Sequence, residues 1–208
     1  MLLTEQLTIA DQLRLQGGTM LEPRQLPGRY GRVIVALEKL LDAANATAVV
    51  AGGWAVWYHG YVGRVTQDVD IVIAIVSQEE LLRIAPVCGF DALDAPHGRW
   101  PKLVHRETGI EVDFLPETAF PGTAHHKAPI PIRHPDVYGA ERGRLRYISL
   151  ECLCELKLGA HRAKDIADLV ELIKVNPGRL SSIHDALAVI HTEYAHEFKD
   201  LITQANEE

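Results

Sequence analysis

Apolar and polar residues along this chain follow two different periods, which separate predicted helices from predicted strands. Apolar residues at helical spacing dominate both ends of the chain and recur in short segments between the strands. This pattern predicts helices over residues 1–15, 32–41, 54–60, 77–85, 149–175 and 181–204.

Shorter apolar runs fill the middle of the chain and predict strands. They cover residues 47–51, 68–76, 102–106, 110–115 and 145–148. The two runs that flank Thr108-Gly109 are typical of a hairpin. Residues 116–135 contain five prolines and are predicted to form an irregular connection.

Acidic residues occupy one face of two predicted strands. Asp68 and Asp70 are two positions apart, which places their side chains on the same face, roughly 6–7 Å apart. Asp113 has a comparable position in the strand 110–115, on the face opposite its apolar residues, so it is a third acid able to join the pair. The opposite face of 68–76 is apolar, with Val69, Ile71, Ile73 and Ile75.

These acids, together with Gly52-Gly53 after the strand 47–51, favour chemistry on a phosphate chain. Glycines let backbone N–H groups approach a phosphate, and carboxylates hold Mg²⁺. Asp113 is a candidate to bind a second metal ion or to take a proton. A Gly-Gly pair alone is usually a turn, and an Asp-x-Asp pair is usually solvated, so the order and spacing of these residues carry the interpretation.

A second charged group lies in the predicted helix 149–175. One interpretation is a solvated helix face with one ion pair. The other is a cationic clamp on a triphosphate, in which Asp165 or Asp168 orients Lys157 or Arg162. The group consists of Lys157, Arg162, Lys164, Asp165 and Asp168.

Other residues that could bind a metal or a base have simpler structural interpretations. His125 and His126 are predicted to be exposed in the proline-rich connection. Trp54, Trp57 and Tyr58 are predicted to pack their helix, with stacking on a base as the alternative. The three cysteines are predicted to be free thiols.

Composition narrows the class of protein. The 208 residues are 47% hydrophobic and 24% charged, which is ordinary for a globular protein. A net charge of −7 argues against a broadly basic surface that coats nucleic acid. No apolar run has the length of a membrane span, and the N-terminus lacks the pattern of a signal peptide, so we expect a cytoplasmic protein without membrane contact.

Two motifs resemble a known family. The first resembles the signature of the nucleotidyltransferase superfamily with the polymerase-β-like fold, and consists of Gly52-Gly53, Thr66-x-Asp68-x-Asp70 and Asp113. The second is similar to the AbiEii-type and minimal nucleotidyltransferase branch, and runs from Ile148 through Lys157, Arg162, Lys164 and Asp165 to Asp168. One departure is Gly53, where many members have Ser, and Gly-Gly-Trp also occurs in aminoglycoside nucleotidyltransferases.

The resemblance implies an α+β fold, with a mixed β-sheet flanked by helices and a helical C-terminal part. The corresponding division is an N-terminal helix and loop (1–29), a nucleotidyltransferase core (30–148) and a helical region that completes the nucleotide site (149–208). It implies Mg²⁺ as the cofactor and an NTP as the substrate. Asp68, Asp70 and Asp113 would be the catalytic metal ligands. Substrate would be bound by Gly52, Gly53, Thr66, Lys157, Arg162 and Asp165.

The expected reaction moves an NMP from an NTP to an acceptor hydroxyl. Branch resemblance favours the toxin of a toxin–antitoxin pair, which modifies tRNA or a protein and has an antitoxin partner. An aminoglycoside-type small-molecule acceptor is one alternative, and a non-catalytic nucleotide- or protein-binding member is another. Basic residues beside the acids, with Arg133, Arg142, Arg144 and Arg146 as candidates, would favour tRNA, and an acidic cleft would favour an aminoglycoside.

Overall fold

The computed structural model describes residues 2–15, 21–93, 100–123, 126–139 and 143–207. The helices are α1 (Leu2–Leu15), α2 (Gly28–Ala43), α3 (Gly52–Tyr58), α4 (Gln78–Ile84), α5 (Leu150–Ala160), α6 (Ala163–Val175), α7 (Leu180–Ile190) and α8 (Thr192–Glu207). The strands are β1 (Ala48–Val50), β2 (Val69–Ile73), β3 (Phe90–Leu93), β4 (Lys102–His105), β5 (Glu111–Pro116), β6 (Gly122–Thr123), β7 (His126–Lys127) and β8 (Leu145–Tyr147).

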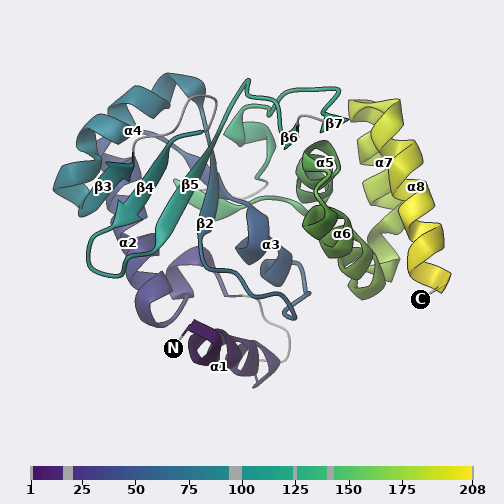
Figure 1. The fold of residues 1–208 in the computed structure, drawn as a ribbon, viewed down its shortest axis with the longest axis horizontal. Coiled ribbons are helices and arrows are strands. Elements are labelled where there is room, and N and C mark those ends of the chain that lie inside the picture. Colours follow the sequence, from purple (N-terminus) through teal and green to yellow (C-terminus); the bar gives the residue numbers. More distant parts are fainter. Residues whose placement is uncertain (1, 16–20, 94–99, 124–125, 140–142, 208) are drawn as a thin grey trace.

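A six-stranded mixed sheet organises the molecule, in the order β3-β4-β5-β2-β1-β8. The pairs β2–β5 and β1–β8 are parallel, and the other neighbours are antiparallel. Figure 1 shows α5 to α8 together on one side of the molecule and α2 and α4 on the other. The predicted α+β class, a mixed sheet flanked by helices with a helical C-terminal part, is confirmed.

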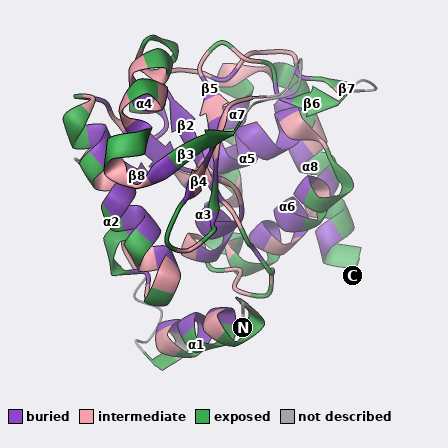
Figure 2. Ribbon diagram, turned by 60° about the vertical axis from the view of Figure 1, so that its left-hand side comes forward, coloured by how far each residue is buried: buried purple, intermediate pink, exposed green. Residues whose placement is uncertain are grey.

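The alternation of apolar and polar residues predicted from the sequence explains which faces of β2 and β5 are buried. Val69 and Ile71 in β2 and Val112 and Phe114 in β5 are fully or almost fully buried, and Figure 2 shows these strands within the buried interior. Asp70 and Asp113 are only partly buried, and they are direct partners in the parallel register. The two carboxylates therefore share one face of the sheet.

The predicted helices 149–175 and 181–204 are each divided in two. His161 adopts a left-handed conformation (φ 49°, ψ 31°) and ends α5, and Arg162 then begins α6. His191 is extended and separates α7 from α8. The apolar periodicity continues through both breaks because the helices on either side bury residues in the same core.

Three details of the strand prediction were wrong. The strand 68–76 ends at Ile73, and Ile75 lies in a 3₁₀ turn with 41% of its surface exposed. β3 was not predicted, because Phe90 is its one buried residue and no alternation marks it. The connection 116–135 contains the short strands β6 and β7.

Helix α1 packs on the core through one face. Ile9, Ala10 and Leu13 are buried, and Gln6 donates a hydrogen bond to the carbonyl oxygen of Thr66. Tyr30 of α2 donates to the same oxygen at 3.2 Å. Within the described ranges, no helix combines the length and the apolar character needed to cross a bilayer.

Candidate active site

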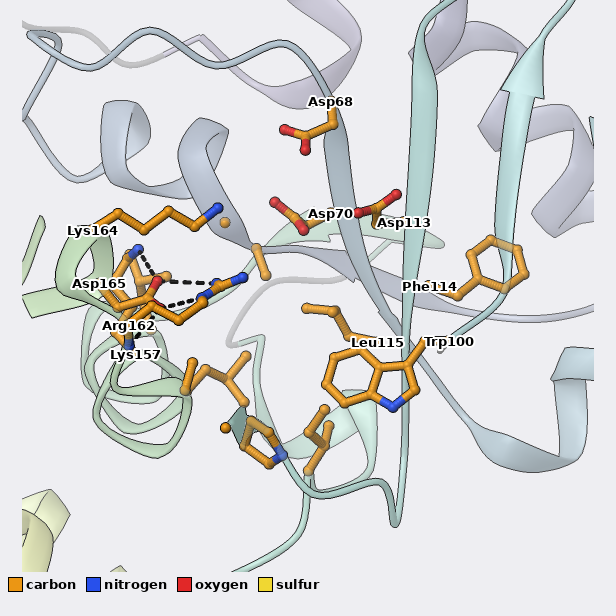
Figure 3. A pocket seen from close by; sticks show the side chains of 18 of the residues that line it. Asp68, Asp70, Trp100, Asp113, Phe114, Leu115, Lys157, Arg162, Lys164 and Asp165 are labelled. Carbon is orange, nitrogen blue, oxygen red and sulfur yellow. Dashed lines mark hydrogen bonds and ion pairs between the residues drawn. The ribbon is translucent and has the colours of Figure 1, made fainter. Parts of the chain in front are cut away.

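A cavity of about 600 Å³ lies between β2 and β5 on one side and α5 and α6 on the other, and is called the central cavity below. It brings together seven of the nine residues predicted for the site. They are Gly52, Asp68, Asp70, Asp113, Lys157, Arg162 and Asp165. Figure 3 shows the three acids on one wall and the charged residues of α5 and α6 facing them.

Negative charge accumulates on the wall formed by β2 and β5. Burial, followed by the charges of Asp68 and Asp113, raises the pKa of Asp70 to about 6. Burial also raises the pKa of Asp113, although Lys102 partly opposes this. A bound divalent cation would relieve this excess of negative charge, so the paired oxygen donors of Asp68 and Asp70 fit Mg²⁺. Among the described residues, no group of three His, Cys, Asp or Glu side chains is arranged to hold a metal ion.

Gly52 leaves room for the carboxylate of Asp70. A Cβ atom on Gly52 would lie 1.7 Å from Oδ2 of Asp70, and the residue has a φ of +57°, which favours glycine. Gly52 is therefore required for the acid to reach its position. This close approach gives the glycine a packing role in addition to the predicted contact with phosphate.

Gly53 and Thr66, the remaining two predicted residues, are not among the residues that line the central cavity. A Cβ atom on Gly53 would lie 2.4 Å from Oγ1 of Thr66. Thr66 is buried, and its hydroxyl donates to Oδ1 of Asp68 at 3.4 Å. In this structure Thr66 supports Asp68, and Gly53 packs against Thr66. The predicted contact of these two residues with substrate stays a prediction.

The charged group of α5 and α6 is a buried ion-pair network. Nζ of Lys157 lies 2.5 Å from Oδ2 of Asp168 and 3.5 Å from Oδ1 of Asp165. Nε of Arg162 lies 2.6 Å from Oδ2 of Asp165. Burial alone would raise the pKa of Asp165, but Arg162 and Lys157 outweigh it and hold that pKa below its usual value. The expected orientation of Lys157 and Arg162 by the acids is present. The solvated-face interpretation is wrong for the buried residues Lys157, Asp165 and Asp168.

The break at His161 makes this network possible. Because α5 ends there, Arg162 stands at the start of α6, and its backbone N–H donates to Oδ2 of Asp165 at 3.3 Å. The side chain of Arg162 remains half exposed and reaches the cavity. Lys164 also lines the cavity and has no ion-pair partner in the described part of the chain.

Sequence reasoning missed several residues of the cavity, including two cations and a tryptophan. Arg64, in the loop before β2, lies 2.6 Å from Oδ2 of Asp168 and adds a cation to the α5–α6 side. Lys102 of β4 lies 2.8 Å from Oδ1 of Asp113. Trp100, just before β4, forms part of an apolar wall with Leu115 (Figure 3). No signal in the sequence marked this pair, because a register counted from Thr108-Gly109 places Val104, and not Lys102, opposite Asp113.

The remaining candidates lie elsewhere. Trp54 and Trp57 are buried, and Tyr58 stacks on Tyr147, so the prediction that these aromatics pack their helix is confirmed. His126 is partly buried and stacks on His161, which contradicts the predicted exposure, and His125 lies outside the described residues. The three cysteines are free, as predicted.

Of the four arginines proposed for a basic groove, the three within the described residues do not line the central cavity. Arg133 pairs with Glu155, and Arg144 pairs with Asp42. Arg146 is buried and donates to the carbonyl oxygen of Pro135 at 3.2 Å. Arg142 lies outside the described residues.

No protein-family model matches the sequence, and the curated proteins give no significant match. Among solved structures, the chain is similar to ANT(2'')-Ia in a crystal structure with adenylyl-2''-tobramycin. The identity is 15% and the TM-score 0.41, over 84% of this chain and 95% of that chain. A solution structure of the antibiotic-resistance factor ANT(2'')-Ia matches with 18% identity and a TM-score of 0.42, over 83% and 92%. At this identity and TM-score the similarity does not assign a function to the chain, so the function is inferred from the cavity.

Proposed function

We propose that the protein is a Mg²⁺-dependent nucleotidyltransferase that moves an NMP from an NTP to an acceptor hydroxyl. One observation carries this proposal: three acids on β5 and at the start of β2 face a cluster of cations from α5 and the start of α6 across one cavity. The two walls suit the two needs of the reaction. Acids hold the metal that accompanies an NTP, and cations hold its phosphate chain.

Asp68 and Asp70 would hold the metal. When bound, Mg²⁺ supplies positive charge to the phosphate oxygens in the transition state. The chain itself fixes these acids before substrate arrives, because the backbone of β2, the space beside Gly52 and the hydroxyl of Thr66 determine where they point. Preformed placement of charged groups lowers the cost of reorganisation during reaction.

The cations of the opposite wall would receive the triphosphate. Lys157 is 4% exposed and bound to two carboxylates, so its main effect is to fix Asp165 and Asp168. Arg162 and Lys164 are exposed and line the cavity. Asp165 holds Nε and Nη2 of Arg162, which leaves Nη1 of Arg162 and the ammonium group of Lys164 to reach phosphate oxygens. Arg64 lies beside them and is held by Asp168.

Asp113 would take the proton of the acceptor hydroxyl. The hydroxyl oxygen forms a bond to the α-phosphorus, and the bond from that phosphorus to the oxygen bridging to the β-phosphate breaks. The hydroxyl proton passes to Asp113, and pyrophosphate leaves with the electron pair of the broken bond. The raised pKa of Asp113 suits a group that accepts a proton.

The acceptor is either a macromolecule or a small cationic molecule. A tRNA or protein acceptor would fit a toxin of a toxin–antitoxin pair. A small aminoglycoside-type acceptor is favoured by a specific observation, which is that Arg133, Arg144 and Arg146 are engaged away from the cavity. The wall around Asp113 carries three acids against one ammonium group, that of Lys102, so a net negative charge remains there to attract a cationic acceptor.

The test is incubation with each α-³²P-labelled NTP and Mg²⁺, in parallel with total tRNA, a mixed protein fraction and a panel of aminoglycosides. The matched control is the double variant Asp68→Ala/Asp70→Ala. Label on one acceptor, absent in the control, would support the proposal and identify both nucleotide and acceptor class. Binding of NTP with no label on any acceptor would favour the non-catalytic alternative.

A further inference from the structure

Lys102 faces Asp113 across the β4–β5 hairpin. The two residues are direct partners in the antiparallel register. Nζ of Lys102 lies 2.8 Å from Oδ1 of Asp113 and 3.0 Å from Oε2 of Glu111, and Lys102 lines the central cavity. The ammonium group is therefore held at the cavity wall by two carboxylates of the same strand.

This contact changes what Asp113 can bind. One of its two oxygens is already in an ion pair with an ammonium group, and the other is left for the cavity. A divalent cation on Asp113 would be positioned next to that ammonium group and would be repelled by it. Asp68 and Asp70 have no such cation paired with them among the described residues. The donors in the cavity thus differ in kind, although all three are aspartates.

We propose that Lys102 is a positioning residue, which holds Asp113 for its part in the transfer and supplies there the positive charge that a second metal ion would otherwise provide. Divalent metal is then confined to Asp68 and Asp70. Lys102 fixes one oxygen of Asp113, so the other oxygen faces the acceptor hydroxyl in a defined direction. Such orientation matters because a displacement of about 1 Å in a reacting group can cost about 10²-fold in rate.

The first part of the test is direct metal binding, measured by Mn²⁺ titration with electron paramagnetic resonance on the nucleotide-free protein. We expect Asp70→Asn to abolish Mn²⁺ binding and Asp113→Asn to leave it unchanged. Lys102→Met frees Asp113 and is expected to bind an additional Mn²⁺, which the double variant Lys102→Met/Asp113→Asn loses again. A purely structural lysine would not increase metal binding when removed.

The second part is kinetic and uses the same variants with labelled NTP. We expect Lys102→Met to lower kcat by about 10²-fold with little change in the KM for NTP, and Lys102→Arg to restore part of the loss. Arg106→Met is the matched control, because it removes a cation of the same hairpin from an exposed pair with Asp91. This control is expected to keep the wild-type kcat.

Two results would overturn the inference: loss of Mn²⁺ binding in Asp113→Asn comparable to that in Asp70→Asn, or an unchanged kcat in Lys102→Met. The inference rests on the proposed nucleotidyl transfer, and the titration separates the two. Wild type that follows the expected Mn²⁺ pattern but transfers no label would count against the proposed function alone.

Discussion

Gly52 and Asp70 lie so close that a single methyl group on Gly52 would displace the acid, with its Cβ atom 1.7 Å from Oδ2 of Asp70. We therefore expect Gly52→Ala to lower the rate of nucleotidyl transfer by about 10²-fold or more, because the carboxylate must leave its position. Steady-state kinetics with labelled NTP would measure this loss.

Gly109→Ala separates the effect of the clash from that of backbone strain. Gly109 has a similar φ of +68°, but a Cβ atom there would meet nothing within 4 Å. Both variants are expected to lose about 1–2 kcal/mol of unfolding free energy from the left-handed conformation, and Gly109→Ala is expected to keep its activity. Equal activity in the two variants would contradict the role assigned to Gly52.

Asp70 is expected to reduce the stability of the metal-free protein at neutral pH. Its pKa is raised to about 6, so the folded state binds this proton more tightly than the unfolded state does. The contribution of Asp70 to stability is therefore fully present below about pH 4 and is lost as the pH rises to about 6. At pH 7, Asp70→Asn should raise the free energy of unfolding by about 1–3 kcal/mol.

Urea unfolding in EDTA across this pH range would measure the effect. The gain should disappear near pH 4, where the wild-type acid is also neutral. Asp91→Asn is the control, since the Arg106 hydrogen bond lowers rather than raises the pKa of that exposed acid and no gain is expected. A gain in Asp70→Asn that is equally large at pH 4 would show that charge is not its cause.

Asp168 should matter more for stability than Lys157. Asp168 pairs with both Lys157 and Arg64, so Asp168→Asn leaves two cations with a reduced share of negative charge. Lys157→Met leaves Asp168 paired with Arg64. We expect Asp168→Asn to cost about 3–5 kcal/mol of unfolding free energy and Lys157→Met to cost less.

Denaturant titration without ligands would rank the two variants. Arg83→Ala, which breaks an exposed pair with Glu80, should leave the midpoint unchanged. A larger loss in Lys157→Met than in Asp168→Asn would mean that the lysine, and not the shared acid, holds the network together.

Arg64 is expected to contribute to NTP binding. It lines the cavity beside Arg162 and is 19% exposed, so it can offer a charge-assisted hydrogen bond to phosphate. Arg64→Met should raise the KM for NTP about tenfold. Arg24→Met, which removes an exposed cation paired with Glu38, is the comparison expected to leave KM unchanged. The same KM in both variants would exclude Arg64 from the nucleotide site.

The acids of the site could be predicted from sequence because strand geometry fixes their direction. Asp68, Asp70 and Asp113 stand at positions where alternation separates a polar face from an apolar one. The α+β fold class could also be predicted, because apolar residues recur with different periods in strands and in helices. The pairing of Asp70 with Asp113 on neighbouring strands could be predicted only from the strand register, and two short segments do not specify their register.

The other wall was harder to predict. Arg64 lies in a loop, where no periodicity indicates direction. The boundary between α5 and α6 is a left-handed histidine, so the glycine that usually marks a helix end was missing. The sequence predicted that Asp165 or Asp168 orients Arg162, but it did not indicate that Arg162 pairs with Asp165 from the position that precedes α6.

The hydrogen bond from Gln6 to the carbonyl oxygen of Thr66 has a practical consequence for anyone producing this protein. Thr66 also supports Asp68, so the first turns of α1 are tied to the loop that carries this proposed metal ligand. Figure 1 shows the N-terminus beside α1 and the other terminus at the end of α8. A purification tag or a shortened N-terminus would disturb this tether and depress activity measurements, whereas a tag placed after α8 leaves it intact.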